Sequence, residues 1–373
     1  MRDRVVNKMI TDLEITGFRG FDKFRLHDLG RVNLLVGINN GGKTSILEAI
    51  EFLASQGDLR PISAAIMRRG EYMWSDSQRE VSDLEIDACR LFHGYNMDAD
   101  TCFTIRGKCK NTTNTVQAAI IENGSDNSSE QIEFPGPYLL KLIWNLSDVR
   151  EVKLRLSHQG GLSYSRLGRR YNRNPSEQTS KAFFISTDSL SMDEVVPLFE
   201  DIVLTPEEQL VIESIKIIEP TIERIASVSG KKGVFIKSLG IRGGLVVKCK
   251  GIRQRIPIGS MGDGIWRMLG IALALVKAKD GILLIDEIDT DLHFTVMEDL
   301  WKLITQAANR LNVQVFATTH NSDCWRSLAD VLCDDNAVND GVTIQRIEKD
   351  KKESVAFTEE EIVIAAERET EVR

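Results

Sequence analysis

The chain has 373 residues and a formal net charge of −8. Hydrophobic residues make up 42% of it and charged residues 27%, which are ordinary proportions for a soluble globular protein. This length allows two domains, or one large domain with an insertion. The acidic balance gives no global attraction to nucleic acid, so such binding would need a local basic patch or a partner.

No apolar run reaches the length of about 18 residues that a transmembrane helix needs. Residues 1–14 lack the apolar core of a signal peptide. The six cysteines are scattered and include no C-x-x-C pair, which argues against a zinc site and suits a reducing cytoplasm. We therefore expect a cytoplasmic protein that has no membrane partner.

Residues 37–44 read GINNGGKT and fit the phosphate-loop pattern G-x-x-x-x-G-K-[ST]. In this pattern, Lys43 reaches the outer phosphates and the Thr44 hydroxyl can ligate Mg²⁺. A buried-strand pattern precedes the loop at residues 32–36, and a helical pattern follows at residues 45–53, so the phosphates would lie at a helix N-terminus. The predicted nucleotide-binding residues are Gly37, Asn39, Asn40, Gly41, Gly42, Lys43, Thr44 and Ser45.

A second motif lies further along the chain. Ser260 and Gly262 belong to a Ser-x-Gly-x-Gly sequence, which precedes an apolar helical pattern at residues 265–278. The hydroxyl, the backbone and the helix N-terminus are donors that suit a phosphate. The alternative is a plain helix-capping turn.

Residues 282–287, ILLIDE, form an apolar strand pattern that ends in two carboxylates. A carboxylate at the C-terminal end of a parallel strand lies in the crevice where the phosphate loop also opens. We predict that Asp286 holds the Mg²⁺ shell and that Glu287 polarises the attacking water. A purely structural role is disfavoured, because two buried acids are costly without a cation or hydrogen-bonded partners.

A further apolar strand pattern at residues 312–320 ends in His320. Taken alone, such a histidine is more often a structural hydrogen-bonding residue than a catalytic one.

The order of these motifs resembles the ATP-binding-cassette head of the RecF-like, SMC-like and OLD-like ATPases. The resemblance covers residues 11–58 and 181–345. It implies an α/β P-loop NTPase of the ATP-binding-cassette (ABC) head type, with a mixed sheet flanked by helices. It makes Ser260 and Gly262 a signature motif that caps the γ-phosphate bound by a second subunit. It makes His320 a switch histidine that senses the γ-phosphate, and Arg19, after the first strand, a contact of the nucleotide base.

Two departures from the pattern limit the resemblance. The signature differs from the LSGGQ consensus, as it often does in RecF-like and OLD-like proteins. Asp289 stands where OLD-like proteins often carry Glu, so His293 has no specific assignment: it could contact nucleotide or the neighbouring subunit, or cap the next helix.

We expect five segments. They are an N-terminal lobe of the head at residues 1–58, a mostly β or α+β insertion at 59–180, a helical segment with a hairpin at 181–257, a C-terminal lobe at 258–350 and a tail at 351–373. The insertion shows alternating patterns at residues 84–88, 101–107 and 116–121, and helical periodicity covers residues 193–227. The lack of long heptads excludes an extended SMC-type coiled coil.

The resemblance implies a Mg²⁺-dependent ATPase that works as a homodimeric clamp, with two ATP molecules bound between two heads. Turnover by the isolated protein should be slow, because the signature loop must come from the partner. Few residues follow His320, so we expect no Toprim nuclease domain of the OLD type. Relatives that pair such ATPases with separate effectors act in antiphage defence or DNA maintenance. A separate nuclease or toxin is therefore the expected effector partner.

The main alternative is a RecF-like DNA-binding module in which ATP times release. Its support would be a basic stripe formed by residues 166–173, which include four arginines, and by Arg2, Arg4 and Lys8. Such a run is more often a solvated loop, and the acidic balance counts against DNA. A transporter's cassette subunit fits poorly, because of the signature and the long insertion.

Overall fold

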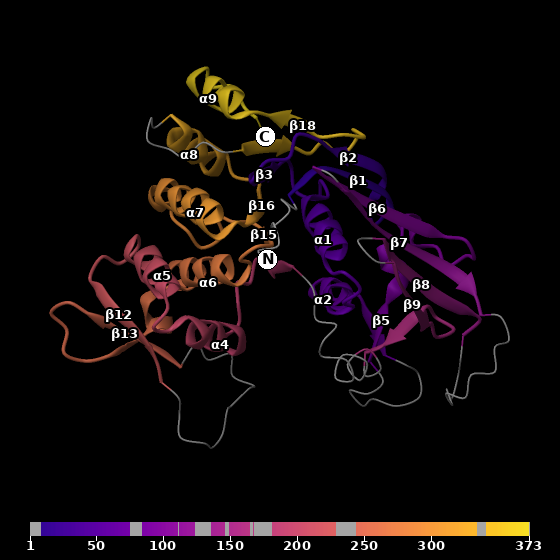
Figure 1. Cartoon of the computed structure of the whole chain (residues 1–373), viewed down its shortest axis with the longest axis horizontal. Helices are drawn as coiled ribbons and strands as arrows, with labels where there is room; N and C mark the ends of the chain where they lie inside the picture. Colours follow the sequence, from indigo (N-terminus) through magenta and orange to yellow (C-terminus); the bar gives the residue numbers. More distant parts are fainter. Residues whose placement is uncertain are drawn as a thin grey trace, which may run out of the picture. The chain divides into compact units, whose positions relative to one another are not determined.

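Two units that interleave along the sequence make up the chain (Figure 1). The computed structural model describes residues 9–74, 84–110, 112–123, 136–145, 149–164, 167, 181–228, 244–333 and 341–372. Unit 1 consists of residues 1–29, 39–182 and 347–356, and unit 2 of residues 30–38, 183–346 and 357–373. The chain passes from unit 2 into unit 1 between Ile38 and Asn39, inside the phosphate loop.

An antiparallel six-stranded sheet dominates unit 1. Its order is β2-β1-β6-β7-β8-β9. The strands are β1 (Ile10–Phe18), β2 (Phe21–Leu26), β6 (Cys102–Cys109), β7 (Thr112–Glu122), β8 (Tyr138–Asn145) and β9 (Val149–Arg155). Buried residues alternate with more exposed ones along β6, and Ile105 lies opposite Ile15 on one side and Val116 on the other. One face of the sheet is therefore apolar.

Helix α1 (Lys43–Ala54) packs on that apolar face. The Trp144 indole N–H of β8 donates to the Phe52 carbonyl oxygen at 3.2 Å and to Ser55 Oγ at 3.0 Å, near the end of the helix. On β6, a Cβ added to Gly107 would lie 2.4 Å from Leu53 Cδ2, so any larger residue here would force the Leu53 side chain to shift. The helix that follows the phosphate loop is thus held firmly within unit 1.

Smaller elements complete unit 1. They are α2 (Arg60–Arg68), the 3₁₀ turns η2 (Ala88–Leu91) and η3 (His93–Tyr95), and a three-stranded sheet in the order β10-β5-β4. The strands of that sheet are β10 (Gly161–Ser163), β5 (Leu84–Asp87) and β4 (Tyr72–Trp74).

The sheet of unit 2 has the order β11-β15-β16-β3-β17-β18. Its strands are β11 (Ala182–Ile185), β15 (Ile282–Ile285), β16 (Gln314–Thr319), β3 (Val32–Val36), β17 (Val342–Arg346) and β18 (Val355–Phe357). The four strands β15, β16, β3 and β17 are parallel. Their carboxyl ends therefore meet at one edge of the sheet, which Gly37, Asp286 and His320 follow directly.

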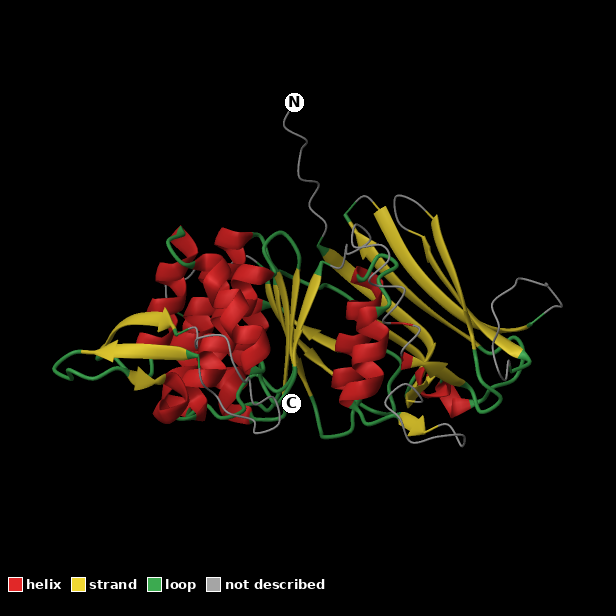
Figure 2. Cartoon of the chain, turned by 90° about the horizontal axis from the view of Figure 1, so that it is seen from below, coloured by secondary structure: helices red, strands yellow, loops and turns green. Residues whose placement is uncertain are grey.

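Helices of unit 2 gather on one face of this sheet (Figure 2). They are α4 (Met192–Ile202), α5 (Pro206–Lys216), α6 (Asp263–Lys277), α7 (Met297–Leu311), α8 (Ser322–Leu332) and α9 (Glu359–Glu367). Trp266, Trp301 and Trp325 are among the largest fully buried side chains. Each indole N–H finds an acceptor at 2.9 to 3.1 Å, which removes the cost of burying it.

A second, three-stranded sheet of unit 2 lies beside α4 and α5, in the order β12-β13-β14. It consists of β12 (Ile222–Ser227), β13 (Leu245–Cys249) and β14 (Ile256–Pro257), and β14 leads into the 3₁₀ turn η5 (Ile258–Met261). The helical prediction for residues 193–227 is therefore wrong at residues 222–227. Pro220 interrupts the helical pattern, and pairing with β13 then favours a strand.

The α/β fold class, with a mixed sheet and flanking helices, is confirmed. The segment boundaries at residues 58 and 180 remain a prediction, and contacts group residues 39–182 with β1 and β2. None of the described helices is long and apolar enough to cross a membrane. The predicted basic stripe at residues 166–173, with Arg2, Arg4 and Lys8, lies outside the described residues except at position 167.

Candidate nucleotide site

The start of α1 in unit 1 has a backbone shape that suits the predicted phosphate loop. Gly42 adopts a left-handed φ of 94°, and a Cβ there would lie 2.4 Å from the Phe21 ring, so no other residue fits without a shift. Asn40 is also left-handed, with a φ of 61°. Among the described residues, no side chain caps this helix end by a hydrogen bond. Lys43 and Thr44 thus open a helix whose N-terminal dipole favours anions.

Glu48, one turn further along α1, is buried between two arginines. Its Oε2 lies 2.5 Å from Arg19 Nε, and its Oε1 accepts a hydrogen bond of 2.9 Å from Arg69 Nε. Arg69 also donates to Ser45 Oγ at 3.1 Å, and Arg19 pairs with Glu71 at 2.9 Å. Sequence reasoning missed this network, because it joins residues from β1 to the loop after α2.

Arg19 is 4% exposed and has a left-handed φ of 50°. Glu48 and Glu71 hold its guanidinium against α1, so the position of the Arg19 side chain is fixed. Contact of Arg19 with the nucleotide base remains a prediction.

Glu51 is the second buried acid of α1. Burial raises its pKa to about 7, and the ion pair of 2.6 Å with Arg68 Nη2 only partly offsets this rise. Arg68 and Arg69, at the end of α2, thus hold two acids on the helix of the phosphate loop.

In unit 2, Asp286 lies at the carboxyl edge of the parallel sheet, directly after β15. It is 8% exposed, and its Oδ1 accepts a hydrogen bond of 2.7 Å from Thr318 Oγ1 of β16. Thr318 Oγ1 in turn accepts from the Glu287 N–H at 2.8 Å. The pairing of Ile285 with Ala317 puts Thr318 in this position, so the parallel register was the signal that could have found it.

Glu287 and His320 are brought together at the same edge. Glu287 Oε2 lies 2.5 Å from His320 Nδ1, and the two share a hydrogen bond. Glu287 has a left-handed φ of 46°, a conformation that costs energy in a residue with a Cβ. Its side chain is 21% exposed and that of His320 is 52% exposed, so both are accessible to a ligand.

Arg267 of α6 is a functional candidate that sequence reasoning missed. It is fully buried, and its guanidinium donates to the carbonyl oxygens of Ser186, Asp286 and Glu287 at 2.6, 2.8 and 2.9 Å. Burial lowers the pKa of its guanidinium. The negative charges of nearby acids, of which Asp291 contributes most, offset this lowering only in part. Arg267 therefore ties α6 to the turn that carries both acids.

The predicted signature, Ser260 and Gly262, directly precedes α6. Ser260 and Gly262 are exposed, and Gly262 has a φ of 97° with open space where a Cβ would lie. Gly264 packs closely, because a Cβ there would lie 3.0 Å from the Asp291 carbonyl oxygen. The signature turn is thus at the surface, whereas the start of α6 contacts the segment after the acidic pair.

Residues 289–293 make local contacts. Asp289 Oδ1 accepts from Thr319 Oγ1 at 2.7 Å. His293 caps the turn η6 (Phe294–Val296) through its contacts with Thr295, which is one of the roles that the sequence left open.

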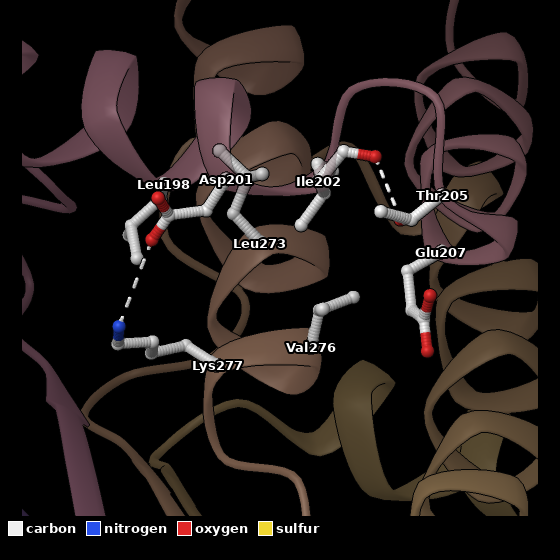
Figure 3. Close-up of a pocket in the computed structure, with 8 residues that line it drawn as sticks. All are labelled: Leu198, Asp201, Ile202, Thr205, Glu207, Leu273, Val276 and Lys277. Atoms are coloured by element: carbon white, nitrogen blue, oxygen red, sulfur yellow. Dashed lines mark hydrogen bonds and ion pairs between the residues drawn. The ribbon is translucent and has the colours of Figure 1, made fainter.

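A hollow of about 270 Å³ lies between α4, the start of α5 and the C-terminal half of α6 (Figure 3). Leu198, Ile202, Leu273 and Val276 supply its apolar lining, and Lys277 pairs with Asp201 at 3.9 Å beside it. Lys277 ends α6, whereas the signature precedes its first residue. The hollow is therefore separate from the motif residues.

A phosphate-loop motif, a signature-like turn, an acidic strand end and a histidine-ended strand follow one another along the sequence, in the order that is typical of ABC-type P-loop ATPases. Two family matches agree with this class. Residues 9–141 match an AAA ATPase domain, and residues 245–323 match an AAA domain described as a candidate AbiEii toxin of a type IV TA system. Two separate stretches of the chain are thus similar to AAA ATPase domains, in agreement with its motifs.

Individual proteins and structures are more distant. The chain is 22% identical over 339 residues to an ATP/GTP phosphatase of Helicobacter pylori, covering 87% of this chain and 88% of that protein. It is 43% identical to an uncharacterised protein of Methanocaldococcus jannaschii over 47 residues, which are 13% of this chain and 22% of that protein. An SMC head bound to the C-terminal winged-helix domain of ScpA aligns with a TM-score of 0.47 at 14% identity over 94% and 97% of the two chains. The SMC head domain from Thermotoga maritima aligns with a TM-score of 0.42 at 12% identity, over 94% of this chain and 98% of that chain.

Proposed function

We propose that this ATPase is Mg²⁺-dependent and acts as a homodimer in which the signature of one subunit completes the site of the other. The observation that carries the proposal is the Glu287–His320 hydrogen bond, formed beside Asp286 at the carboxyl edge of the parallel sheet. An acid that could activate water is thereby oriented next to an acid that could hold a cation.

The phosphates are bound by the loop and the first turn of α1. The backbone N–H groups of residues 37–44 surround the phosphate chain, and the Lys43 ammonium neutralises the outer phosphates. The left-handed Gly42 supports this role, because it turns the chain into the helix without a side chain in the way.

The donor set suits Mg²⁺, which favours a few protein oxygens together with substrate phosphates and waters over an all-protein cage. The Asp286 carboxylate and the Thr44 hydroxyl would hold it. Thr318 supports this assignment, because its hydrogen bond to Oδ1 orients the Asp286 carboxylate. When bound, Mg²⁺ would offset negative charge on the transferred phosphoryl group.

Glu287 accepts the proton of the attacking water as the water approaches the γ-phosphate. His320 orients the Glu287 carboxylate in the resting state and contacts the γ-phosphate when ATP is bound. The half-exposed His320 ring supports this role, because a buried ring could not reach a ligand.

The exposed signature turn supports the dimer. Ser260 and Gly262 present a hydroxyl and open backbone at the surface, where a second subunit's nucleotide could contact them. Turnover by a monomer would then be slow, because one donor group of the site would be missing.

We further infer that the clamp controls a separate effector in the cytoplasm. The match of residues 245–323 to a toxin–antitoxin AAA family supports a toxin or nuclease as that effector. A DNA transaction of the RecF type is the alternative, with ATP timing release.

The test is phosphate release by wild type and Glu287→Gln, with binding of a fluorescent ATP analogue measured in parallel. We expect kcat to fall by at least about 100-fold in Glu287→Gln, while nucleotide binding persists. Chelation of Mg²⁺ should abolish phosphate release by wild type.

The matched control is Glu298→Gln, the same substitution at an exposed position of α7. It should leave kcat unchanged. Equal turnover by wild type and Glu287→Gln would contradict the assignment of the catalytic base.

A further inference from the structure

The exposed face of the β12–β14 sheet carries a row of cations. Arg224 of β12 lies directly opposite Lys248 of β13. On the other side of β13, Val246 pairs with Pro257 and Val247 with Ile256. The same register, continued by one residue, places Arg255 across from Lys248.

Two more cations, Lys250 and Arg253, lie in the exposed turn between β13 and β14. We call these five residues the basic face: Arg224, Lys248, Lys250, Arg253 and Arg255. The sheet lies beside α4 and α5 within unit 2, at the left in Figure 1.

Within the described part of the chain, none of the five forms an ion pair. Lys248 donates to the carbonyl oxygen of Ile252, so its ammonium is held at the turn. Cations on the unit 1 sheet behave differently: Lys23, Lys108 and Lys153 are 53–65% exposed, yet each lies within 4 Å of a carboxylate.

Two acids, Glu219 and Glu223, lie near the face and are outnumbered by its five cations. Glu219 is hydrogen bonded to Thr221, which lowers its pKa. Glu223 lies at the bulge that shifts the register between Ile222 and Arg224. Like charges directly opposite each other destabilise a sheet, so this row carries a cost that an anionic partner would remove.

We propose that the basic face binds the phosphate backbone of a nucleic-acid duplex without regard to sequence. Three adjacent strands at about 4.8 Å spacing give a row about 10 Å long, a scale that suits several backbone phosphates. Residues 222–227 and 245–257 contain no aromatic side chain, so the face lacks the stacking groups that single strands use. Because the whole chain is acidic, binding depends on this local patch.

The basic face lies close in the sequence to the predicted signature, so binding of a duplex there could affect ATP turnover. β14 leads into η5, which contains Ser260 and ends next to Gly262, so a duplex on the turn would lie close in the sequence to the predicted signature. Stimulation of ATP turnover by duplex would follow. This consequence rests on the proposed function, whereas binding of the duplex does not.

The test is fluorescence anisotropy with a labelled random-sequence duplex of about 30 base pairs, without nucleotide, from about 50 to 200 mM salt. The variant replaces Lys250, Arg253 and Arg255 by alanine, and the matched control replaces Lys23, Lys108 and Lys153. We expect the variant to bind at least about 10-fold more weakly and to lose about 2 to 3 from the slope of log K against log salt. The control should bind like wild type.

Thermal unfolding and binding of the ATP analogue establish that the variant is folded. Wild type that fails to bind duplex at low salt, or a variant that binds as well as wild type, would overturn the proposal. Polyglutamate that binds wild type more tightly than duplex would also overturn it, in favour of an acidic protein. Because no nucleotide is present, these results are independent of the ATPase test.

Discussion

At the residue scale, the acids of this chain lie in two contrasting environments. Glu287 is partly exposed, lies next to His320 and has a strained backbone, which suits a group that meets a ligand. Glu48 and Glu51 on α1 are buried and paired with arginines. Their task is structural, because they attach the phosphate-loop helix to β1 and to the end of α2.

Glu51 makes stability depend on pH. Burial raises its pKa from 4.5 to about 7, so between these values the folded state holds a proton that the unfolded state has lost. Stability attributable to Glu51 therefore falls as pH rises from about 4.5 to about 7, by about 3 kcal/mol in total. Because Glu51→Gln lacks this ionisation, its free energy of unfolding relative to wild type should rise by that amount between about pH 4.5 and pH 8.

Denaturant unfolding at a series of pH values measures this difference. Glu360→Gln on α9, at an exposed position, is the control and should run parallel to wild type. A constant difference between Glu51→Gln and wild type across the range would show that Glu51 ionises normally.

At the element scale, α6 joins the signature turn to the acidic strand end. Its first residue follows Gly262, and about one turn further on, Arg267 donates to the carbonyl oxygens of Asp286 and Glu287. A shift of α6 on contact with nucleotide would therefore move the backbone of Glu287, the proposed catalytic base. We therefore propose that Arg267 is a positioning residue, which acts through Glu287.

Substitution of Arg267 by lysine should separate turnover from binding. A single ammonium cannot reproduce the planar set of donors that spans Ser186, Asp286 and Glu287. We expect kcat to fall by about 10- to 100-fold through misplacement of Glu287, with the KM for ATP nearly unchanged. Steady-state phosphate release measures both constants.

Arg326→Lys, at an exposed position of α8, is the matched control. A rise of KM with unchanged kcat in Arg267→Lys would mean that the residue supports nucleotide binding instead. Loss of the folded state would be visible in the thermal unfolding curve.

At the scale of the whole molecule, the chain crosses between its units inside the phosphate loop. Residues 30–38 belong to one unit and residues 39–182 to the other. The signature is exposed on unit 2, which suits assembly with a second copy. Nucleotide is therefore expected to govern association.

Glu287→Gln should form a dimer in the presence of Mg-ATP and remain monomeric without it, because bound ATP persists when hydrolysis is blocked. Light scattering coupled to size-exclusion chromatography measures the mass. Ser260→Arg in the same background should prevent the shift, since it would place a bulky side chain where the proposed dimer shares the phosphate. A monomer under every condition would contradict the shared-site proposal, and a constitutive dimer would mean that ATP changes shape instead of association.

Local chemistry was sufficient to predict much of this protein. The strand before the phosphate loop, the helix after it and the apolar helix after Gly262 all occur at the predicted places. These elements are encoded by apolar periodicity and by glycines that adopt a positive φ at the start of a helix. The order of the motifs then indicated the ATPase class.

Only the tertiary structure determined the contacts between distant segments. Four such contacts join residues that are far apart in the sequence. They are the pairing of β1 with β6, the Arg19–Glu48 ion pair, the hydrogen bond of Thr318 to Asp286 and the hydrogen bonds of Arg267 to the backbone after β15. Residues 222–227 became a strand because β13 was available to pair with them. The basic face has the same origin: Arg224, Lys248 and Arg255 form a row only when β-sheet register aligns them. Periodicity describes one element at a time, whereas register and long-range pairing depend on the whole fold.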